Sequence, residues 1–413
     1  MSENENGARA KKAVRPRRIK KASNFFFWLL RVVLRPVLWL KYRFRFEHRT
    51  AKGIKRPCLI LSNHQTSFDQ FAVGVGFRFG INFVAGDSIF RHGFKSWLMQ
   101  VLTNPIPYAK GSSDASAIKN IFSIIRKGGA VGIFPSGNRS FFGEECTLRP
   151  TGKLAKKLGV PLVLVQMRGG YNTKPRWKQK PNKGKMRASV QRVISREELQ
   201  ALSAEELDKI IHDTLYLDEF AWNKQQQIVF KGKRKAEFLE GVLFYCPQCG
   251  TLNRLHSHRN QLTCTCGMCV AVNETGEFTK IRNADNCPDT VLAWGQMQLE
   301  HIKALDYAPY AQQPLFHDIG ARLNKVERSK KDEPLGEGAI SLYADKLTVC
   351  EKEFPLAKIH DMSIQSMARL TLYTDEGEFT VDLPKRGNAF KYMVCGYRIK
   401  NLSGDTNTET YGY

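Results

Sequence analysis

Short apolar runs alternate with amphipathic stretches between residues 57 and 166. The runs at 57–62, 80–85, 129–134 and 160–166 have the length and composition of buried strands. The stretches at 115–127 and 151–158 between them are helical in character. Strands that alternate with helices predict an α/β fold with a mostly parallel sheet flanked by helices. In sheets of this kind, functional side chains lie beyond the carboxyl ends of the strands.

The segment before these strands combines apolar and basic residues. Thirteen of the sixteen residues at 25–40 are apolar, and a helix of that length spans roughly 24 Å, less than the roughly 30 Å hydrocarbon core of a bilayer. Arg31 and Arg35 share one helix face, and Pro36 is expected to end the helix or to begin a second one. We therefore expect residues 23–50 to form amphipathic helices in an anionic membrane interface. The alternatives are a core helix with two snorkelling arginines and, less favoured, a spanning helix.

The charge balance points to polyanionic partners. The chain has 64 Lys and Arg against 39 Asp and Glu, a formal net charge of +25. Anionic lipid, phosphorylated substrates, acidic carrier proteins and nucleic acid all fit such a balance. Residues 1–22 are polar and basic and predict a disordered arm. Residues 168–192 carry nine Lys or Arg and no acidic residue, which indicates either a solvated loop or a platform for anionic headgroups, coenzyme A phosphates or a carrier protein.

His64 and Asp69 follow the first predicted strand. In a continuous helix, side chains five residues apart point in different directions and cannot touch. If the helix begins just after His64, with Thr66 or Ser67 as N-cap, Asp69 in its first turn can reach back to His64. A histidine whose second nitrogen is held by a carboxylate is a general base. The pair is therefore a candidate catalytic dyad.

Four motifs together give the sequence a family resemblance. His64 and Asp69 are followed by Pro-Ile-Pro-Tyr-Ala-Lys-Gly at 105–111, Phe-Pro-Ser-Gly-Asn-Arg-Ser at 134–140 and Val-Pro-Leu-Val-Leu-Val at 160–165. In order and spacing these resemble the four motifs of the 1-acyl-sn-glycerol-3-phosphate (lysophosphatidic acid) acyltransferase family, over roughly residues 25–215.

That resemblance implies a fold, an activity and a set of site residues. Family members are α/β enzymes on the membrane surface, in which a His-Asp dyad activates an acceptor hydroxyl that attacks an acyl thioester of coenzyme A or acyl carrier protein. His64 then corresponds to the base, and Asp69 to the residue that orients it. The implied substrate-binding residues are Lys110 of the second motif and Ser136, Gly137, Asn138 and Arg139 of the third. The acyltransferase domain is expected at 51–235, on the cytoplasmic face of the cell membrane and bound to it peripherally or monotopically.

The third motif departs from the family pattern at one position. The family usually has a glutamate between the proline and the glycine, and this chain has Ser136 there. Serine can still form hydrogen bonds but carries no charge, so acceptor positioning, substrate identity or turnover is expected to differ. A non-catalytic lipid-binding relative is therefore an alternative to the enzyme.

Five cysteines between residues 246 and 269 predict a zinc ribbon at 240–280. Cys246 and Cys249 form a Cys-x2-Cys-Gly turn, and Cys264 and Cys266 precede a second glycine. Two such turns make a tetrahedral structural zinc site with no open position. Cys269 is the alternative fourth ligand, because pairing it with Cys266 restores the two-residue spacing.

The remainder of the chain predicts a small β-rich α+β module. Strand-like segments at 338–351, 354–364, 369–373 and 378–383 are followed by a helical stretch at 388–401. Residues 285–403 loosely resemble a pleckstrin-homology or GRAM-like barrel, and residues 404–413 form a tail. A nucleic-acid-binding zinc-ribbon protein is unlikely, because the ribbon itself is not markedly basic.

Overall fold

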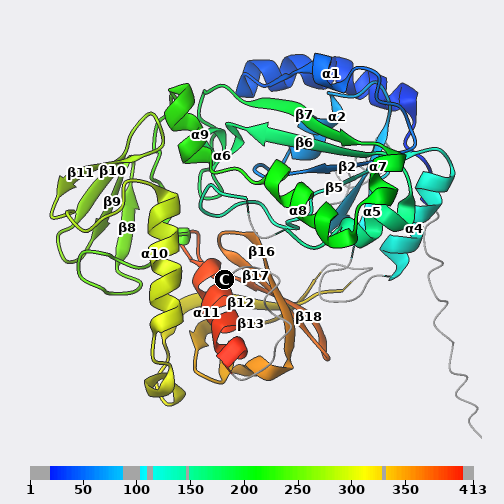
Figure 1. Cartoon of the computed structure of the whole chain (residues 1–413). Coiled ribbons are helices and arrows are strands. Elements are labelled where there is room, and N and C mark those ends of the chain that lie inside the picture. The colour runs from blue at the N-terminus through cyan, green and yellow to red at the C-terminus, as the bar shows by residue number, and fades with distance from the viewer. Residues whose placement is uncertain (1–18, 87–102, 109–114, 146–147, 328–331, 403–413) are drawn as a thin grey trace, which may run out of the picture.

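The computed structural model describes residues 19–86, 103–108, 115–145, 148–327 and 332–402. Three units follow one another along the chain, an α/β unit, a small four-stranded sheet and a seven-stranded sheet with a long helix (Figure 1). The α/β unit contains β1 (Arg45–Phe46), β2 (Cys58–Ser62), β3 (Ile81–Gly86), β4 (Ile106–Tyr108), β5 (Ala130–Ile133), β6 (Leu162–Arg168) and β7 (Arg187–Ile194). Its described helices are α1 (Asn24–Tyr42), α2 (Asp69–Gly74), α4 (Ala115–Arg126), α5 (Gly152–Leu158), α6 (Gly170–Thr173), α7 (Arg196–Ala201), α8 (Ala204–Leu215) and α9 (Glu219–Gln226).

The first sheet is mostly parallel, as predicted. Its strand order is β1-β7-β6-β2-β5-β3-β4, and only β6 and β7 pair antiparallel. Alternate residues of the central strands face opposite sides: Ile60 packs in the core cluster of α1 and α2, and Leu59 and Leu61 pack with α4 and α8. Burial on both faces explains why these strands are apolar throughout. The carboxyl ends of β6, β2 and β5 are neighbours, and the candidate motifs follow these strands.

The structure corrects three expectations for this unit. Residues 19–22 are packed rather than part of a disordered arm: Ile19 and Ala22 are buried, and the Ala22 N–H donates to Asn82 Oδ1 at 2.9 Å. The segment from residue 23 forms one helix, α1, which continues through Pro36. Residues 187–194, in part assigned to a basic loop, form β7. Residues 1–18 and the tail from 404 lie outside the described residues.

The second and third units are antiparallel. The small sheet, β11-β10-β9-β8, comprises β8 (Leu255–His258), β9 (Gln261–Cys264), β10 (Cys269–Val272) and β11 (Phe278–Arg282), and α10 (Val291–Ala304) follows. The larger sheet has the order β15-β14-β13-β12-β18-β17-β16. Its elements are β12 (Phe316–Lys325), β13 (Glu333–Leu342), β14 (Lys346–Val349), β15 (Lys352–Pro355), β16 (Ile359–Ser366), β17 (Arg369–Thr374), β18 (Gly377–Asp382) and the helix α11 (Ala389–Leu402). The sequence missed β12, and it merged β13 with β14, which residues 343–345 separate, and β15 with β16, which residues 356–358 separate.

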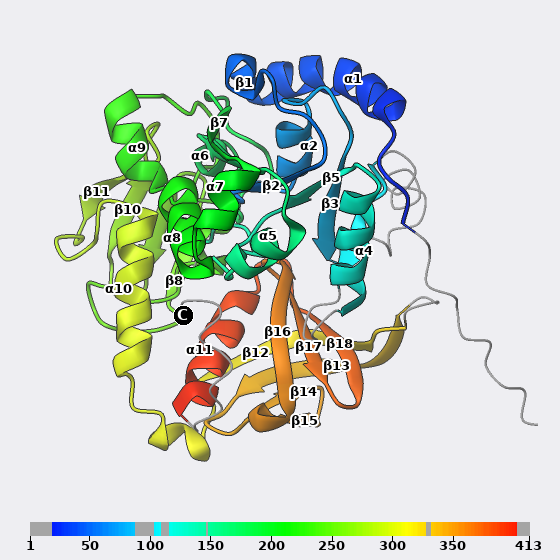
Figure 2. The ribbon, with the colours of Figure 1, turned by 45° about the vertical axis from the view of Figure 1, so that its right-hand side comes forward.

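One hydrophobic cluster contains residues of all three units. In both views α11 lies beneath the α/β unit, with α10 beside it (Figures 1 and 2). The ring of Phe390 on α11 stacks on Phe141 of the α/β unit with centroids 4.3 Å apart, and it meets Phe142 edge-on at 5.6 Å. All three side chains are buried in a cluster that also contains residues of the small sheet. The three units are therefore packed against one another and are not connected only by linkers.

Candidate active site and metal centre

His64 and Asp69 meet at the carboxyl end of β2. His64 lies on the loop after the strand, and Asp69 is the first residue of α2. His64 Nδ1 is 2.8 Å from Asp69 Oδ2. The helix begins later than expected, with Phe68 rather than Thr66 or Ser67 at the N-cap, and Asp69 still reaches back to the histidine.

The Asp69 carboxylate organises the whole turn. Its Oδ2 accepts hydrogen bonds from the backbone N–H groups of Gln65 (2.6 Å) and Thr66 (2.8 Å), and its Oδ1 accepts from the Thr66 hydroxyl. Asp69 is fully buried. Four donors around one buried carboxylate fix its orientation toward His64.

The His64 ring is held on its other side by an aromatic residue. Phe134, the residue after β5, stacks on the imidazole with centroids 4.4 Å apart and an interplanar angle of 22°. Burial lowers the pKa of His64 and outweighs the opposing effect of Asp69. A neutral ring that donates from Nδ1 to Asp69 leaves the lone pair on Nε2 to accept a proton. The His64 side chain is 19% exposed, so the ring is partly accessible to solvent.

The third motif packs directly against the histidine loop. It follows β5, and the Ser140 N–H donates to the backbone oxygen of His64 at 3.0 Å. Gly137 has a φ of 65°, which favours glycine at this turn. Ser136 is buried and Asn138 is half-buried. Burial lowers the pKa of Arg139, while Asp69 raises it. Lys110 of the second motif lies outside the described residues.

A glutamate that sequence reasoning missed completes the support of His64. Glu145 is buried, and its two carboxyl oxygens lie 3.3 and 3.1 Å from the His64 backbone nitrogen, whose N–H donates to them. Burial raises the pKa of Glu145 to about 8, against the smaller opposing effects of the Ser136 hydroxyl and the His64 N–H. No spacing rule in the sequence singles out this residue, because the loop that carries it returns to His64 only in three dimensions.

Further cations surround Arg139. Arg176 Nη1 donates to the backbone oxygen of Arg139 at 2.8 Å, and its guanidinium lies 3.8 Å from the Phe141 ring centroid. Burial lowers the pKa of Lys174 to about 8, and Arg139 and Lys41 contribute. Lys174 and Arg176 belong to the basic run at 168–192, which was the signal in the sequence for them.

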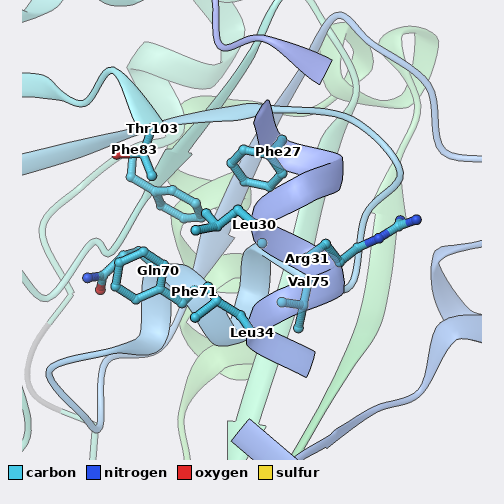
Figure 3. Close-up of a pocket in the computed structure, with 10 residues that line it drawn as sticks. Phe27, Leu30, Arg31, Leu34, Gln70, Phe71, Val75, Phe83 and Thr103 are labelled. Carbon is cyan, nitrogen blue, oxygen red and sulfur yellow. The ribbon is translucent and has the colours of Figure 1, made fainter. Parts of the chain in front are cut away.

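An apolar pocket lies beneath α1 (Figure 3). Phe27 and Leu34 of α1 line it, together with Phe71 of α2 and Phe83 of β3. Phe83 also stacks on Phe134, with centroids 5.8 Å apart, so a row of rings leads from this pocket toward His64. The pocket has a volume of about 10 Å³, which is room for one water molecule and far less than an acyl chain requires.

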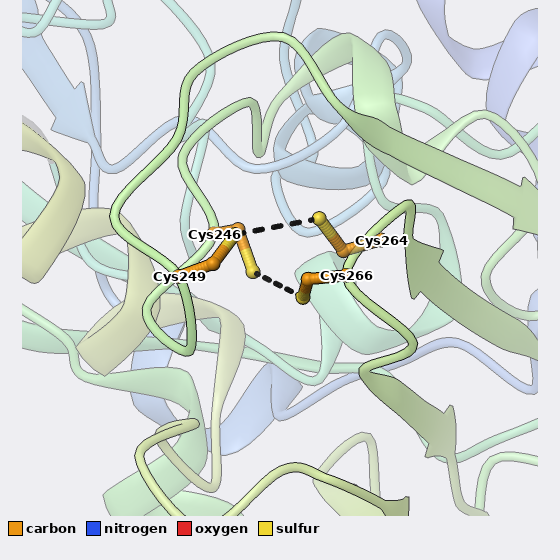
Figure 4. Close-up of side chains that lie close together, drawn as sticks. All are labelled: Cys246, Cys249, Cys264 and Cys266. Carbon is orange, nitrogen blue, oxygen red and sulfur yellow. Dashed lines mark hydrogen bonds between the residues drawn. The ribbon is translucent and has the colours of Figure 1, made fainter.

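Four cysteine sulfurs converge in the second unit (Figure 4). The Sγ atoms of Cys246, Cys249, Cys264 and Cys266 all lie within 4.8 Å of one another. Cys246 and Cys266 are 3.9 Å apart, and Cys249 and Cys264 are 3.8 Å apart. Four sulfurs at the corners of a tetrahedron with Zn–S distances of about 2.3 Å would be about 3.8 Å apart. The cluster therefore fits a four-coordinate metal ion with thiolate ligands.

The two turns that present these sulfurs are built alike. Gly250 and Gly267 have φ values of 70° and 91°, and their N–H groups donate to the backbone oxygens of Cys246 and Cys264. Cys269 is buried in β10 and is not a member of the cluster. The glycine that follows Cys266 thus identified the fourth cysteine better than the two-residue spacing did.

The family-model comparison with known proteins concerns the α/β unit. Residues 41–168 match the family model named Acyltransferase. A chloroplastic 1-acyl-sn-glycerol-3-phosphate acyltransferase of Brassica napus is 28% identical over 118 residues, which are 27% of this chain and 33% of the relative. A 1-acyl-sn-glycerol-3-phosphate acyltransferase of Pseudomonas aeruginosa is 29% identical over 164 residues, 38% of this chain and 60% of the relative. The chain therefore spans about a third of the length of the Brassica napus protein and about three fifths of the length of the Pseudomonas aeruginosa protein.

A solved structure shows a further likeness. The crystal structure of the 1-acyl-sn-glycerophosphate acyltransferase PlsC from Thermotoga maritima superposes with a TM-score of 0.41 at 19% identity and covers 48% of this chain and 79% of that one. The matched residues 41–168 contain the dyad, the third motif and Glu145. Residues 41–168 are therefore the part of this chain that is similar to the acyltransferase family.

Proposed function

We propose that this protein transfers an acyl chain from a thioester, acyl-CoA or acyl carrier protein, to the hydroxyl of a lysophospholipid. The acceptor that fits best is 1-acylglycerol-3-phosphate. The observation that carries the proposal is the buried dyad: a neutral His64 aimed by Asp69, in a domain that matches the acyltransferase family. Both curated relatives are named 1-acyl-sn-glycerol-3-phosphate acyltransferases.

The proposed reaction needs a general base and an acceptor hydroxyl that is aligned with the thioester carbon. His64 Nε2 accepts the proton of the acceptor hydroxyl as its oxygen attacks the thioester carbon. The carbon–sulfur bond then breaks, and the leaving thiolate takes the proton back from the imidazolium. Asp69 keeps Nδ1 protonated and stabilises the imidazolium that forms. Arg139, and Lys110 outside the described residues, supply cations for the acceptor phosphate.

The decisive experiment measures acyl transfer to lysophosphatidic acid. His64→Ala should lower kcat by about 10²–10⁴-fold, and His212→Ala, at an exposed histidine that also contacts an aspartate, is the matched control. If the wild type transfers from neither acyl-CoA nor acyl carrier protein, the non-catalytic lipid-binding alternative suggested by Ser136 replaces this proposal.

We further propose that α1 rests on an anionic membrane. Nine large apolar side chains of α1 are at least 39% exposed: Phe25, Phe26, Trp28, Leu29, Val32, Val33, Val37, Trp39 and Leu40. An apolar patch of this kind on one helix is typical of an interfacial helix. Among the described helices, none combines the length and the apolar composition needed to cross a bilayer.

Cations lie beside this apolar face. An open pocket of about 500 Å³ is lined by basic side chains and by no acidic one among the described residues; its basic lining is Arg31, Arg35, Arg49, Lys52 and Arg78, together with His48. Burial, and then the charge of Arg35, lowers the pKa of His48, which makes it a neutral partner for Arg35. Such a pocket at the edge of an interfacial helix suits phosphate headgroups.

Vesicle sedimentation tests the membrane proposal. Val33→Gln with Leu40→Gln should reduce binding to vesicles that contain phosphatidylglycerol. Ile281→Gln with Ile319→Gln removes two apolar side chains of similar exposure elsewhere and should leave binding intact. Binding of the wild type should weaken with salt. Equal losses in both double variants would contradict the assignment of α1.

For the cysteine cluster we propose a structural zinc ion. All four positions of a tetrahedral site are taken by cysteines, so the ion would stabilise the second unit rather than act on a substrate.

A further inference from the structure

The third motif of this chain lacks the carboxyl group that the family usually places between proline and glycine. Ser136 stands there, and it is 3% exposed. A carboxyl group nevertheless lies beside Ser136, because Glu145, nine residues further along the chain, interacts with the Ser136 hydroxyl.

The contacts of Glu145 lead directly to the proposed base. Both of its carboxyl oxygens accept the backbone N–H of His64. The backbone oxygen of His64 accepts from the Ser140 N–H at 3.0 Å. One loop therefore holds His64 by both of its backbone polar groups, while Asp69 and Phe134 hold its ring.

The Ser136 hydroxyl lies beside the Glu145 carboxyl. Its interaction with Glu145 lowers the pKa of that carboxyl, as the His64 N–H does, against the larger opposing effect of burial. Ser136 Oγ also donates to the backbone oxygen of Asn138 at 3.1 Å. Ser136 therefore packs beside the same carboxyl group that accepts the His64 N–H.

We propose that Glu145 is the positioning residue for His64, and that it supplies through space the carboxyl group that Ser136 replaces in the third motif. This inference rests on the proposed function, in which His64 is the base. It also explains how the site tolerates serine at this position: the carboxyl group is moved to another residue rather than lost.

Three substitutions and one control test the proposal. Glu145→Gln keeps a carbonyl oxygen that accepts the His64 N–H, so its kcat should stay within about threefold of wild type. Glu145→Ala leaves the His64 N–H without an acceptor, and a shift of the base by about 1 Å should lower kcat about 10²-fold with little change in KM. Ser136→Glu with Glu145→Ala should recover at least tenfold over Glu145→Ala. Glu144→Ala is the control, because that side chain contacts Tyr216 and Gln296 instead.

A readout that does not depend on activity separates this inference from the proposed function. The imidazole of His64, assigned by comparison with His64→Gln, is titrated by NMR in each variant. The pKa of His64 should rise toward the ordinary value in Glu145→Ala and return in the double variant.

If wild type transfers no acyl group but these shifts occur, the proposed function fails and the positioning role stands. A Glu145→Ala variant with unchanged titration and unchanged kcat would overturn the inference, as would a double variant that recovers neither. A Glu145→Gln variant as impaired as Glu145→Ala would contradict positioning through the His64 N–H.

Discussion

Replacement of Asp69 by asparagine and by alanine should separate its charge from its role as an acceptor. Asp69 Oδ2 accepts three N–H groups, from the His64 ring and from the backbone of Gln65 and Thr66. Oδ1 accepts only the Thr66 hydroxyl, which can rotate. Asparagine can therefore place its oxygen at the Oδ2 position and its amide nitrogen at the Oδ1 position, with the Thr66 hydroxyl turned to accept.

The two variants should differ in how much stability they lose, because they differ in whether the buried N–H groups keep an acceptor. Alanine leaves the backbone N–H groups of Gln65 and Thr66 buried without an acceptor, at about 1–3 kcal/mol each. We expect Asp69→Ala to lower the free energy of unfolding by about 2–6 kcal/mol. Asparagine keeps these bonds but loses their charge assistance, and should cost about 1–2 kcal/mol. Its kcat should still fall about 10²–10⁴-fold, because the imidazolium loses its counter-charge.

Urea unfolding and acyl transfer, measured on the same preparations, test both halves of this prediction. Asp213→Asn is the matched control, since Asp213 contacts His212 at 3.3 Å on an exposed surface; it should change neither quantity. An Asp69→Asn variant with wild-type kcat, or one as unstable as Asp69→Ala, would refute the reasoning.

Three further predictions concern protons and metal. Because burial lowers the pKa of His64, the acid limb of kcat/KM should lie below pH 6.5; a limb at or above that pH contradicts a buried neutral base. Burial raises the pKa of Glu145 to about 8, above the roughly 4.3 of an unfolded chain, so its contribution to stability is complete below pH 4.3 and is lost as the pH rises toward 8. The urea midpoint should therefore fall less over this range in Glu145→Gln than in wild type. Metal analysis should find one zinc per chain, lost in Cys266→Ser and kept in Cys269→Ser; the reverse pattern would assign the fourth ligand to Cys269.

The sequence predicted those parts of the fold that depend on local composition. Buried parallel strands such as β2 and β6 are apolar throughout, so their runs stand out. By contrast, β7 lies between β6 and the two-residue edge strand β1, mixes polar with apolar residues and carries Arg187 and Arg192, so its sequence looks like a basic loop. Propensity alone could not decide between the two, because strand formation there depends on pairing with β6.

The parts of the candidate site that have a local signal in the sequence were also predictable. The separation of His64 and Asp69 after a strand indicated a turn that brings them together, and the glycine after Cys266 indicated which four cysteines lie together. Glu145 has no such local signal, because the loop beyond the third motif brings it back to His64 from 81 residues away. Lone glutamates are common, and only the folded chain distinguishes this one.

The stacking of Phe141 on Phe390 has a consequence for the order in which the protein is made. The loop that carries Arg139 receives its aromatic support from α11, which leaves the ribosome about 250 residues after that loop. At 5–20 residues per second this interval is on the order of 10–50 s. During it, α1 has long been synthesised while Phe141 and Phe142 still lack their partner. The nascent chain can therefore present its apolar helix to a membrane well before α11 packs against the loop that carries Arg139.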